Sequence, residues 1–245
     1  MKALLDGRPL AALLLDLDDT ILDDGAGFQE AWQLAADILV ARQPTLARDA
    51  VVAEVDRVRS WFWVDEERHR RGRLDLPAAR AEILGAALEA LGRPDPALAR
   101  QAAEAWTALR ERSQRLLPGA REALVRLRSA VPALALVTNG AAAAQRRKLA
   151  RFGLEGFFDH VQIEGEFGAG KPERAVYEHV VARLAVRPEQ CLMVGDNFEL
   201  DVIGAQRAGL HAAWLDPAGQ PAPPRPAPRP HWTVRSLDDL LRLLV

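Results

Sequence analysis

The stretch Leu13-Leu14-Leu15-Asp16-Leu17-Asp18-Asp19-Thr20 decides the predicted fold of this chain. The run over residues 10–15 shows no alternation of apolar and polar residues, which is typical of a strand buried on both faces of a parallel sheet. Asp16 and Asp18 follow at the carboxyl end of that strand, where open α/β sheets bind ligands. Because side chains alternate along a strand, the two acids point to the same side and repel each other unless a cation or a shared proton is present. We therefore expect a metal and proton-transfer chemistry at this point.

The composition of the 245 residues is that of a soluble globular protein, with 49% hydrophobic and 27% charged residues. The net charge of -2 gives no case for nucleic acid or an anionic membrane as a partner. The single cysteine, Cys191, cannot form an intramolecular disulfide, which favours the reducing cytoplasm. The apolar run that ends at Asp16 is too short for a signal sequence or a membrane span. We therefore expect a cytoplasmic protein, and the sequence leaves monomer and homodimer open.

A helical block follows the first strand. Residues 28 to about 116 show the helical period and no strand-type alternation. The expected helices cover residues 29–41, 45–63, 76–91 and 95 or 96 to about 116, with Thr45 as the N-cap of the second. Acids and glycines in residues 21–27 predict a turn before the block, and Pro118-Gly119 ends it.

Beyond residue 119 the pattern changes to short apolar strands that alternate with helices. The strands are expected at 133–137, 158–163, 190–194 and 211–215, and the helices at 120–129, 141–152, 172–184, 199–208 and 237–244. Prolines between residues 217 and 230 predict an exposed loop of polyproline II type. The fold class is therefore α/β, a Rossmann-like parallel sheet core flanked by helices, with an inserted all-helical domain. The core would comprise residues 1–22 and 117–245, and the insert residues 23–116.

Four polar segments fall at the ends of predicted strands or the starts of helices. They are Asp16-x-Asp18-x-Thr20, Thr138-Asn139-Gly140, Lys171-Pro172 and Gly195-Asp196-Asn197-x-x-x-Asp201. In a parallel sheet such positions gather at one edge. Carboxylate ligands without cysteine suit Mg²⁺ rather than zinc. A carboxylate that faces an ammonium and a hydroxyl suits a phosphoryl group held for attack.

These segments, in this order, resemble the four motifs of the haloacid dehalogenase-like (HAD) hydrolase superfamily. The helical insert resembles the cap domain of that superfamily's first cap class, so the resemblance covers residues 10–245. It implies that Asp16 is a nucleophile that forms an aspartyl-phosphate. It also implies that Asp18 is the general acid/base, which protonates the leaving oxygen and then deprotonates the attacking water.

The resemblance also assigns the other motif residues. Thr138 and Asn139 match positions that bind the phosphoryl group, and Lys171 matches the cation that balances the nucleophile and that group. The implied ligands of Mg²⁺ are Asp16, Asp18 through its backbone carbonyl, and Asp196. The supporting positions are Thr20, Asn197 and Asp201. Asp201 would lie near the metal or orient Lys171, with a merely structural acid on a helix surface as the alternative.

The function implied by the resemblance is a Mg²⁺-dependent phosphatase for a small phosphorylated metabolite. Asp18 argues against a haloacid dehalogenase, because a halide leaves without a proton and the family's dehalogenases lack this acid. A phosphomutase similar to β-phosphoglucomutase shares every motif and stays open as the alternative. A non-catalytic homologue would have no need for Asp16, Asp18 and Lys171 together.

Single motifs also fit simpler explanations less well. An EF-hand loop that begins at Asp16 would need Gly at its sixth and Glu at its twelfth position, where the chain has Ile21 and Gly27. The segment from Gly165 to Lys171 imitates a phosphate-binding P-loop, but Pro172 supplies no hydroxyl for Mg²⁺.

Aromatic and basic residues of the helical insert are the candidates for substrate specificity. We expect most of its tryptophans to pack in its own core, although Trp61 and Trp63 cannot share one helix face. The arginines in residues 64–73 are expected on a solvated helix end, with recognition of an anionic part of the substrate as the sharper hypothesis. The candidates are Trp61, Trp63, Arg68 and Arg71.

Overall fold

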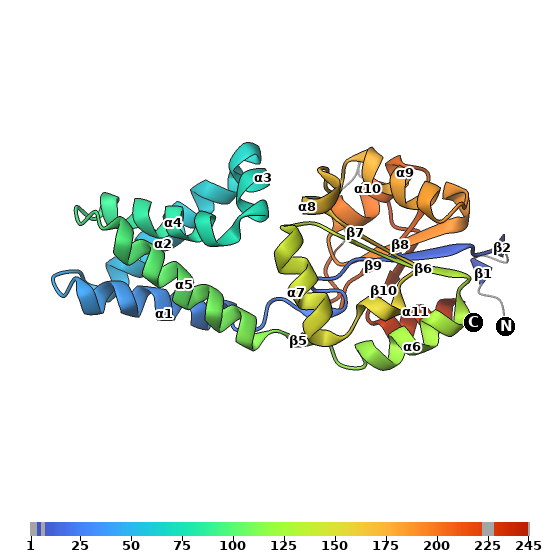
Figure 1. The fold of residues 1–245 in the computed structure, drawn as a ribbon, viewed down its shortest axis with the longest axis horizontal. Coiled ribbons are helices and arrows are strands. Elements are labelled where there is room, and N and C mark those ends of the chain that lie inside the picture. Colours follow the sequence, from blue (N-terminus) through green and yellow to red (C-terminus); the bar gives the residue numbers. More distant parts are fainter. Residues whose placement is uncertain (1–3, 6–7, 222–227, 245) are drawn as a thin grey trace. The chain divides into compact units, whose positions relative to one another are not determined.

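The structure is a computed structural model that describes residues 4–5, 8–221 and 228–244. The described chain divides into two compact units (Figure 1). The α/β unit comprises Met1–Asp23 and Leu116–Val245, and the helical unit comprises Asp24–Arg115. The chain passes between them through two short strands that pair with each other, β4 (Leu22–Asp23) and β5 (Arg115–Leu116).

A parallel sheet forms the centre of the α/β unit. Its strands are β3 (Ala12–Leu15), β6 (Ala133–Thr138), β7 (His160–Ile163), β8 (Cys191–Gly195), β9 (His211–Leu215) and β10 (Trp232–Val234). Their order across the sheet is β10-β9-β8-β3-β6-β7, and each neighbouring pair is parallel. Leu13 of β3 is aligned with Leu134 of β6 and Leu192 of β8. This architecture confirms the predicted fold class.

Both faces of the sheet are buried, which explains the unbroken apolar runs in its strands. Leu13 and Leu15 pack with α6 (Ala120–Ala130) and α11 (Leu237–Leu244). Ala12 and Leu14 belong to the opposite layer, with α9 (Arg174–Arg183) and α10 (Gly204–Arg207). Figure 1 shows these two pairs of helices on the two sides of the sheet. Burial of one leucine side chain contributes about 1.5–3 kcal/mol, so the central strand is held firmly in place.

The remaining elements connect these layers. They are β1 (Leu4–Leu5), β2 (Arg8–Pro9), α7 (Ala142–Phe152), η1 (Glu155–Phe157), α8 (Glu164–Phe167), η2 (Pro188–Gln190) and the π-helical turn η3 (Phe198–Ile203). Ser236 caps α11, because its hydroxyl accepts a hydrogen bond of 3.1 Å from the Asp239 amide. Within the described ranges, none of the helices combines the length and hydrophobicity that a membrane span needs.

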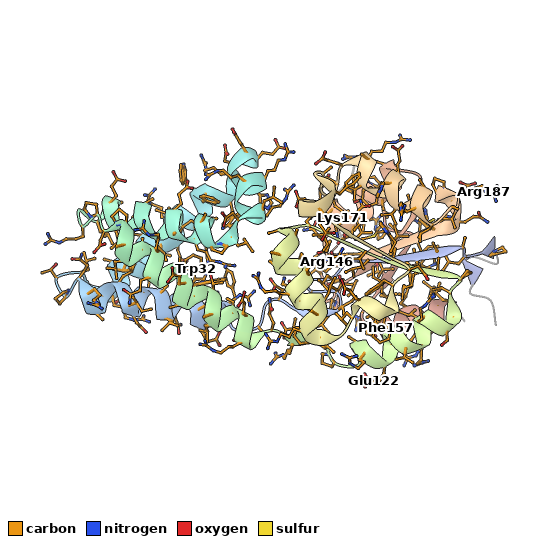
Figure 2. The ribbon with its side chains drawn as sticks, viewed as in Figure 1. Trp32, Glu122, Arg146, Phe157, Lys171 and Arg187 are labelled. Carbon is orange, nitrogen blue, oxygen red and sulfur yellow. The ribbon has the colours of Figure 1, made fainter. Side chains whose placement is uncertain are left out.

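The helical unit has a core of its own. It consists of α1 (Phe28–Arg42), α2 (Arg48–Val64), α3 (Glu66–Leu74), α4 (Leu76–Ala90) and α5 (Pro96–Ser113). Trp32 of α1, labelled in Figure 2, meets Trp106 of α5 edge-on with ring centroids 5.4 Å apart. Both rings are buried, whereas Trp61 is 49% exposed. The prediction that most tryptophans of the insert pack in its own core is therefore confirmed for Trp32 and Trp106.

Several predicted helix boundaries are wrong for local reasons. Thr45 is not an N-cap, because the Leu46 amide bonds to the Gln43 carbonyl in a turn and α2 begins only at Arg48. The basic segment at 64–73 is not the end of α2, because the Asp65 side chain caps the separate helix α3.

Other differences concern the α/β unit. Pro172 lies in a turn before α9, because the Glu173 amide bonds to the Gly170 carbonyl. The sequence pattern missed the short strands β5 and β10. Of the predicted polyproline loop, residues 217–221 and 228–230 contain no helix or strand, and residues 222–227 lie outside the described residues.

Candidate active site

The predicted site lies at one edge of the sheet. Asp16 directly follows β3, Thr138 ends β6, and Asp196 directly follows β8. The chain adds β6 and β7 on one side of β3 but β8, β9 and β10 on the other, so the strand order reverses at β3. Such a reversal leaves a crevice outside the carboxyl ends of the strands, where α/β proteins bind ligands.

Lys171 joins the first and last of the four segments. Its Nζ atom lies 2.6 Å from Asp16 Oδ1 and 2.6 Å from Asp201 Oδ1. The side chain is 2% exposed, and Figure 2 labels it in the α/β unit. Burial alone would lower the pKa of Lys171, but the two carboxylates raise that pKa above its ordinary value. The ammonium is therefore fixed in its charged form.

Three carboxylates share this site with the single ammonium of Lys171. Asp16, Asp196 and Asp201 each offer an oxygen, and these oxygens all lie within 4.8 Å of one another. Burial and the Asp201 charge raise the pKa of Asp16 to about 6, against the opposing effect of Lys171. Burial and the neighbouring Asp16 raise the pKa of Asp196 to about 8. Excess negative charge on hard oxygen donors is the environment that fits a divalent cation.

Asp201 is fully buried and is not a helix-surface acid. One of its oxygens binds Lys171, and the other accepts a hydrogen bond of 3.0 Å from the Asn197 amide. The Asn197 side chain in turn accepts a bond of 3.0 Å from the Leu200 amide and caps η3. These bonds fix the direction in which Asp201 holds Lys171.

Gly195 leaves the space that Asp201 occupies. A Cβ atom at position 195 would lie 2.2 Å from Asp201 Oδ2. We expect Gly195→Ala to displace the Asp201 carboxylate, to lower the melting temperature and to reduce activity by roughly 10-fold or more, because misplaced groups near the chemistry cost rate. Thermal unfolding and steady-state kinetics check this, with Gly156→Ala as the comparison, since a Cβ there would meet no atom within 4 Å. Equal effects of both substitutions on activity would contradict the close-approach argument.

Asn139 has a different part from the predicted one. Its side-chain Nδ2 donates to the Lys171 carbonyl at 2.8 Å, and its Oδ1 accepts from the Lys171 amide at 2.8 Å. The amide thus ties the loop after β6 to the backbone of Lys171 instead of presenting both its ends to a phosphoryl group. Thr138 is buried, with its hydroxyl beside the same loop.

Sequence reasoning missed Glu164, which is buried at the start of α8. Its carboxylate accepts a bond of 2.9 Å from the Gly140 amide. A Cβ at Gly170 would lie 2.6 Å from that carboxylate, so a glycine is needed there for the close approach. An acid next to an apolar strand end was the available signal.

Sequence reasoning also missed Gln145 and Lys148 on α7. Gln145 Nε2 lies 2.9 Å from Asp18 Oδ2, and Lys148 Nζ lies 2.6 Å from Asp18 Oδ1. Their separation of three residues places them on one helix face, which also carries the buried Leu149. Thr20 is fully buried, and its hydroxyl has no hydrogen-bond partner among the residues that the structure describes.

Comparison with known proteins decides the family. The family model of the haloacid dehalogenase-like hydrolases matches residues 10–209. The chain belongs to this family.

HAD-like relatives of this chain include phosphatases. A phosphoserine phosphatase of Thermus thermophilus is 34% identical over 88% of this chain and 92% of its own length. A glyceraldehyde 3-phosphate phosphatase of Methanopyrus kandleri is 30% identical over 82% of each chain. The crystal structure of the HAD-hydrolase YfnB from Bacillus subtilis, bound to magnesium, has a TM-score of 0.71 and 26% identity over 96% of this chain and 98% of that one. The chain is therefore an HAD-like hydrolase of phosphate monoesters.

The candidates for specificity in this HAD-like enzyme all lie in the helical unit. Arg71 forms two hydrogen bonds with Glu82, at 2.8 and 3.1 Å. Arg68 stacks on the Trp61 ring at 3.8 Å and donates to the Trp61 carbonyl at 3.0 Å. Trp63 packs edge-on against His69. The geometry of the α/β unit involves none of these side chains, so their part in recognition stays a prediction.

Proposed function

We propose that this enzyme is a Mg²⁺-dependent phosphatase that hydrolyses a small phosphorylated metabolite through an aspartyl-phosphate on Asp16. The observation that carries the proposal is the buried contact of 2.6 Å between Asp16 and Lys171, beside Asp196 and two residues before Asp18. A carboxylate placed at a strand end next to a fixed ammonium is suited to attack an anionic phosphorus centre.

In the first step an Asp16 oxygen attacks phosphorus. The bond from phosphorus to the substrate oxygen breaks, its electron pair goes to that oxygen, and a proton from Asp18 neutralises it. In the second step water attacks the same phosphorus while Asp18 takes up a proton from it. The bond to Asp16 breaks, and inorganic phosphate leaves with the carboxylate restored.

Charge compensation is the main physical requirement of the first step. Two unit charges of the same sign at about 4 Å and an effective dielectric constant of about 20 repel each other by roughly 4 kcal/mol. The Lys171 ammonium offsets part of this repulsion, and the buried Thr138 hydroxyl is placed at the same sheet edge to donate to a phosphoryl oxygen. Asp16, Asp196 and the Asp18 carbonyl would hold a Mg²⁺ ion, which when bound supplies further positive charge against the phosphoryl oxygens.

We propose further that the helical unit acts as a cap that determines the substrate. Gly27 and Gly119 flank the two connections, and both have positive φ angles, 72° and 73°. The movement between domains that the YfnB structure reveals supports such a cap. Relatives that hydrolyse phosphoserine and glyceraldehyde 3-phosphate support a small metabolite as the substrate. The single buried cysteine supports a cytoplasmic location.

Phosphate release over a panel of phosphorylated acids, sugars and nucleotides, with Mg²⁺ and with a chelator, tests the proposal. We expect release from at least one class of monoester and its loss on chelation. Isomerised sugar phosphate without net release would indicate a phosphomutase. Full turnover in the presence of chelator would contradict the role of the metal.

Asp196 provides a second test, by stability. Because burial raises the pKa of Asp196 to about 8 in the metal-free fold, from an ordinary value of 3.8, the folded state binds more protons than the unfolded chain between these values. Stability of the metal-free protein therefore falls as pH rises through this range. We expect Asp196→Asn to melt several degrees higher than the wild type near pH 8 without metal, to match it near about pH 4, and to lose the stabilisation by Mg²⁺.

Thermal unfolding with and without Mg²⁺ measures these shifts. Glu199→Gln is the matched control, because Glu199 is an exposed acid of the same segment. If Asp196→Asn gained as much from Mg²⁺ as the wild type does, Asp196 would not be a ligand.

A further inference from the structure

The carboxylate of Asp18 is held by two side chains of α7. Lys148 Nζ lies 2.6 Å from Oδ1, and Gln145 Nε2 lies 2.9 Å from Oδ2. The ion pair is partly buried, with 14% of the Lys148 and 28% of the Asp18 side chain exposed. Lys148 and Gln145 lie more than a hundred residues from Asp18 in the chain, so the fold alone brings them together.

Both partners present donors to Asp18. The Lys148 ammonium has no acceptor. Gln145 Nε2 lies 2.7 Å from the Asn139 carbonyl as well as 2.9 Å from Asp18, and both of these groups accept, so the nitrogen of the amide must face them. With a donor at each oxygen, the arrangement accommodates the carboxylate. A carboxylic acid would turn its O–H against one of these donors.

For Asp18 to act as an acid, one of the two contacts must therefore open. Hydrogen bonds between two charged groups are about twice as strong as neutral ones, which favours keeping Lys148. Gln145 loses little when it releases Asp18, because its Nε2 also lies 2.8 Å from Thr138 Oγ1 and 2.7 Å from the Asn139 carbonyl. The exchangeable oxygen is thus Oδ2.

We propose that Lys148 is a positioning residue for the general acid/base. It holds Oδ1 of Asp18 through both proton transfers, while Gln145 holds Oδ2 only in the anionic form. The proton given to the leaving oxygen in the first step, and regained from water in the second, is carried on Oδ2. This inference rests on the proposed function, because it assumes that Asp18 is the acid/base.

The kinetics of p-nitrophenyl phosphate separate the two steps. p-Nitrophenolate leaves without needing a proton, so transfer to Asp16 proceeds without the acid, whereas hydrolysis of the aspartyl-phosphate needs Asp18 as a base. In rapid-mixing experiments with the full-length Lys148→Met variant, we expect the rate constant for p-nitrophenolate formation in the first turnover to stay within about 3-fold of the wild type. The rate constant for phosphate release should fall by about 10- to 100-fold.

Two further variants make the test specific. Lys148→Arg keeps a cation at this position and is expected to restore most of the phosphate-release rate. Arg147→Met removes an exposed cation from the same helix and should leave both rate constants unchanged.

The inference is wrong if Lys148→Met keeps both wild-type rate constants, or if it slows both steps by the same factor, as a general disturbance of the site would. It is also wrong if Arg147→Met reproduces the effect. A wild-type enzyme that releases no phosphate from any monoester would instead refute the proposed function, so the two failures are distinguishable.

Discussion

Asp16→Asn is expected to lower phosphate release by at least about 10⁴-fold, because the substituted amide cannot form the aspartyl-phosphate. The fold should persist, since Lys171 keeps its contact of 2.6 Å with Asp201. The variant should also remove one of the buried carboxylates that repel each other in the metal-free site. Phosphate release at saturating substrate, together with thermal unfolding, measures both effects.

Asp238→Asn is the matched control, because Asp238 is an exposed acid of the same unit that pairs only at the surface with Arg126. It should retain wild-type turnover. Covalent labelling by phosphate at position 16, seen by mass spectrometry after acid quench in the wild type and absent from Asp16→Asn, would add direct evidence. Wild-type turnover by Asp16→Asn would disprove the mechanism.

Lys171→Met is expected to lose both activity and stability. Removal of the ammonium leaves Asp16 and Asp201 as buried carboxylates without their common cation, and breaking a buried ion pair in this way costs about 3–5 kcal/mol. The rate should fall by roughly 10³-fold or more, because the repulsion between Asp16 and the substrate's phosphoryl group is no longer offset.

The loss of stability in Lys171→Met should depend on pH. Burial already raises the pKa of Asp16 to about 6, and without the lysine that pKa rises further. The folded variant then binds more protons than its unfolded chain, so its stability falls as pH increases above about 4. Denaturant unfolding over a pH series measures this.

An exposed cation provides the control for this variant. Arg187, labelled in Figure 2, has 70% of its side chain exposed, and Arg187→Met should change neither stability nor its pH dependence appreciably. A Lys171→Met variant as stable near neutral pH as near pH 4, relative to the wild type, would contradict the assignment of Lys171 as the charge that balances the site.

Much of the α/β unit could be predicted because its signals are local. Strands buried on both faces need unbroken apolar runs, so Leu13 to Leu15 announced β3 and its place in the centre of the sheet. Parallel strands end at a common edge, so Asp16, Thr138 and Asp196 were expected together. Lys171 followed from its place in the motif order rather than from any strand end.

Features that depend on hydrogen bonds between distant segments could not be predicted. Asn139 was expected to bind phosphate, but both ends of its side chain meet the backbone of Lys171, 32 residues away. Thr45 has the right side chain for an N-cap, but the turn before it delays the helix to Arg48. In both cases the residue type permits several partners, and the tertiary structure selects one.

The sequence by itself determined the order of the strands' polar ends and the chemistry of the residues at them. Residue type and apolar run length are local properties, and they fix which groups a parallel sheet must bring to one edge. Only the tertiary structure decided that Lys171 joins Asp16 to Asp201 and that Lys148 and Gln145 hold Asp18. Those contacts join side chains up to 155 residues apart, and the packing of helices against the sheet sets their distances.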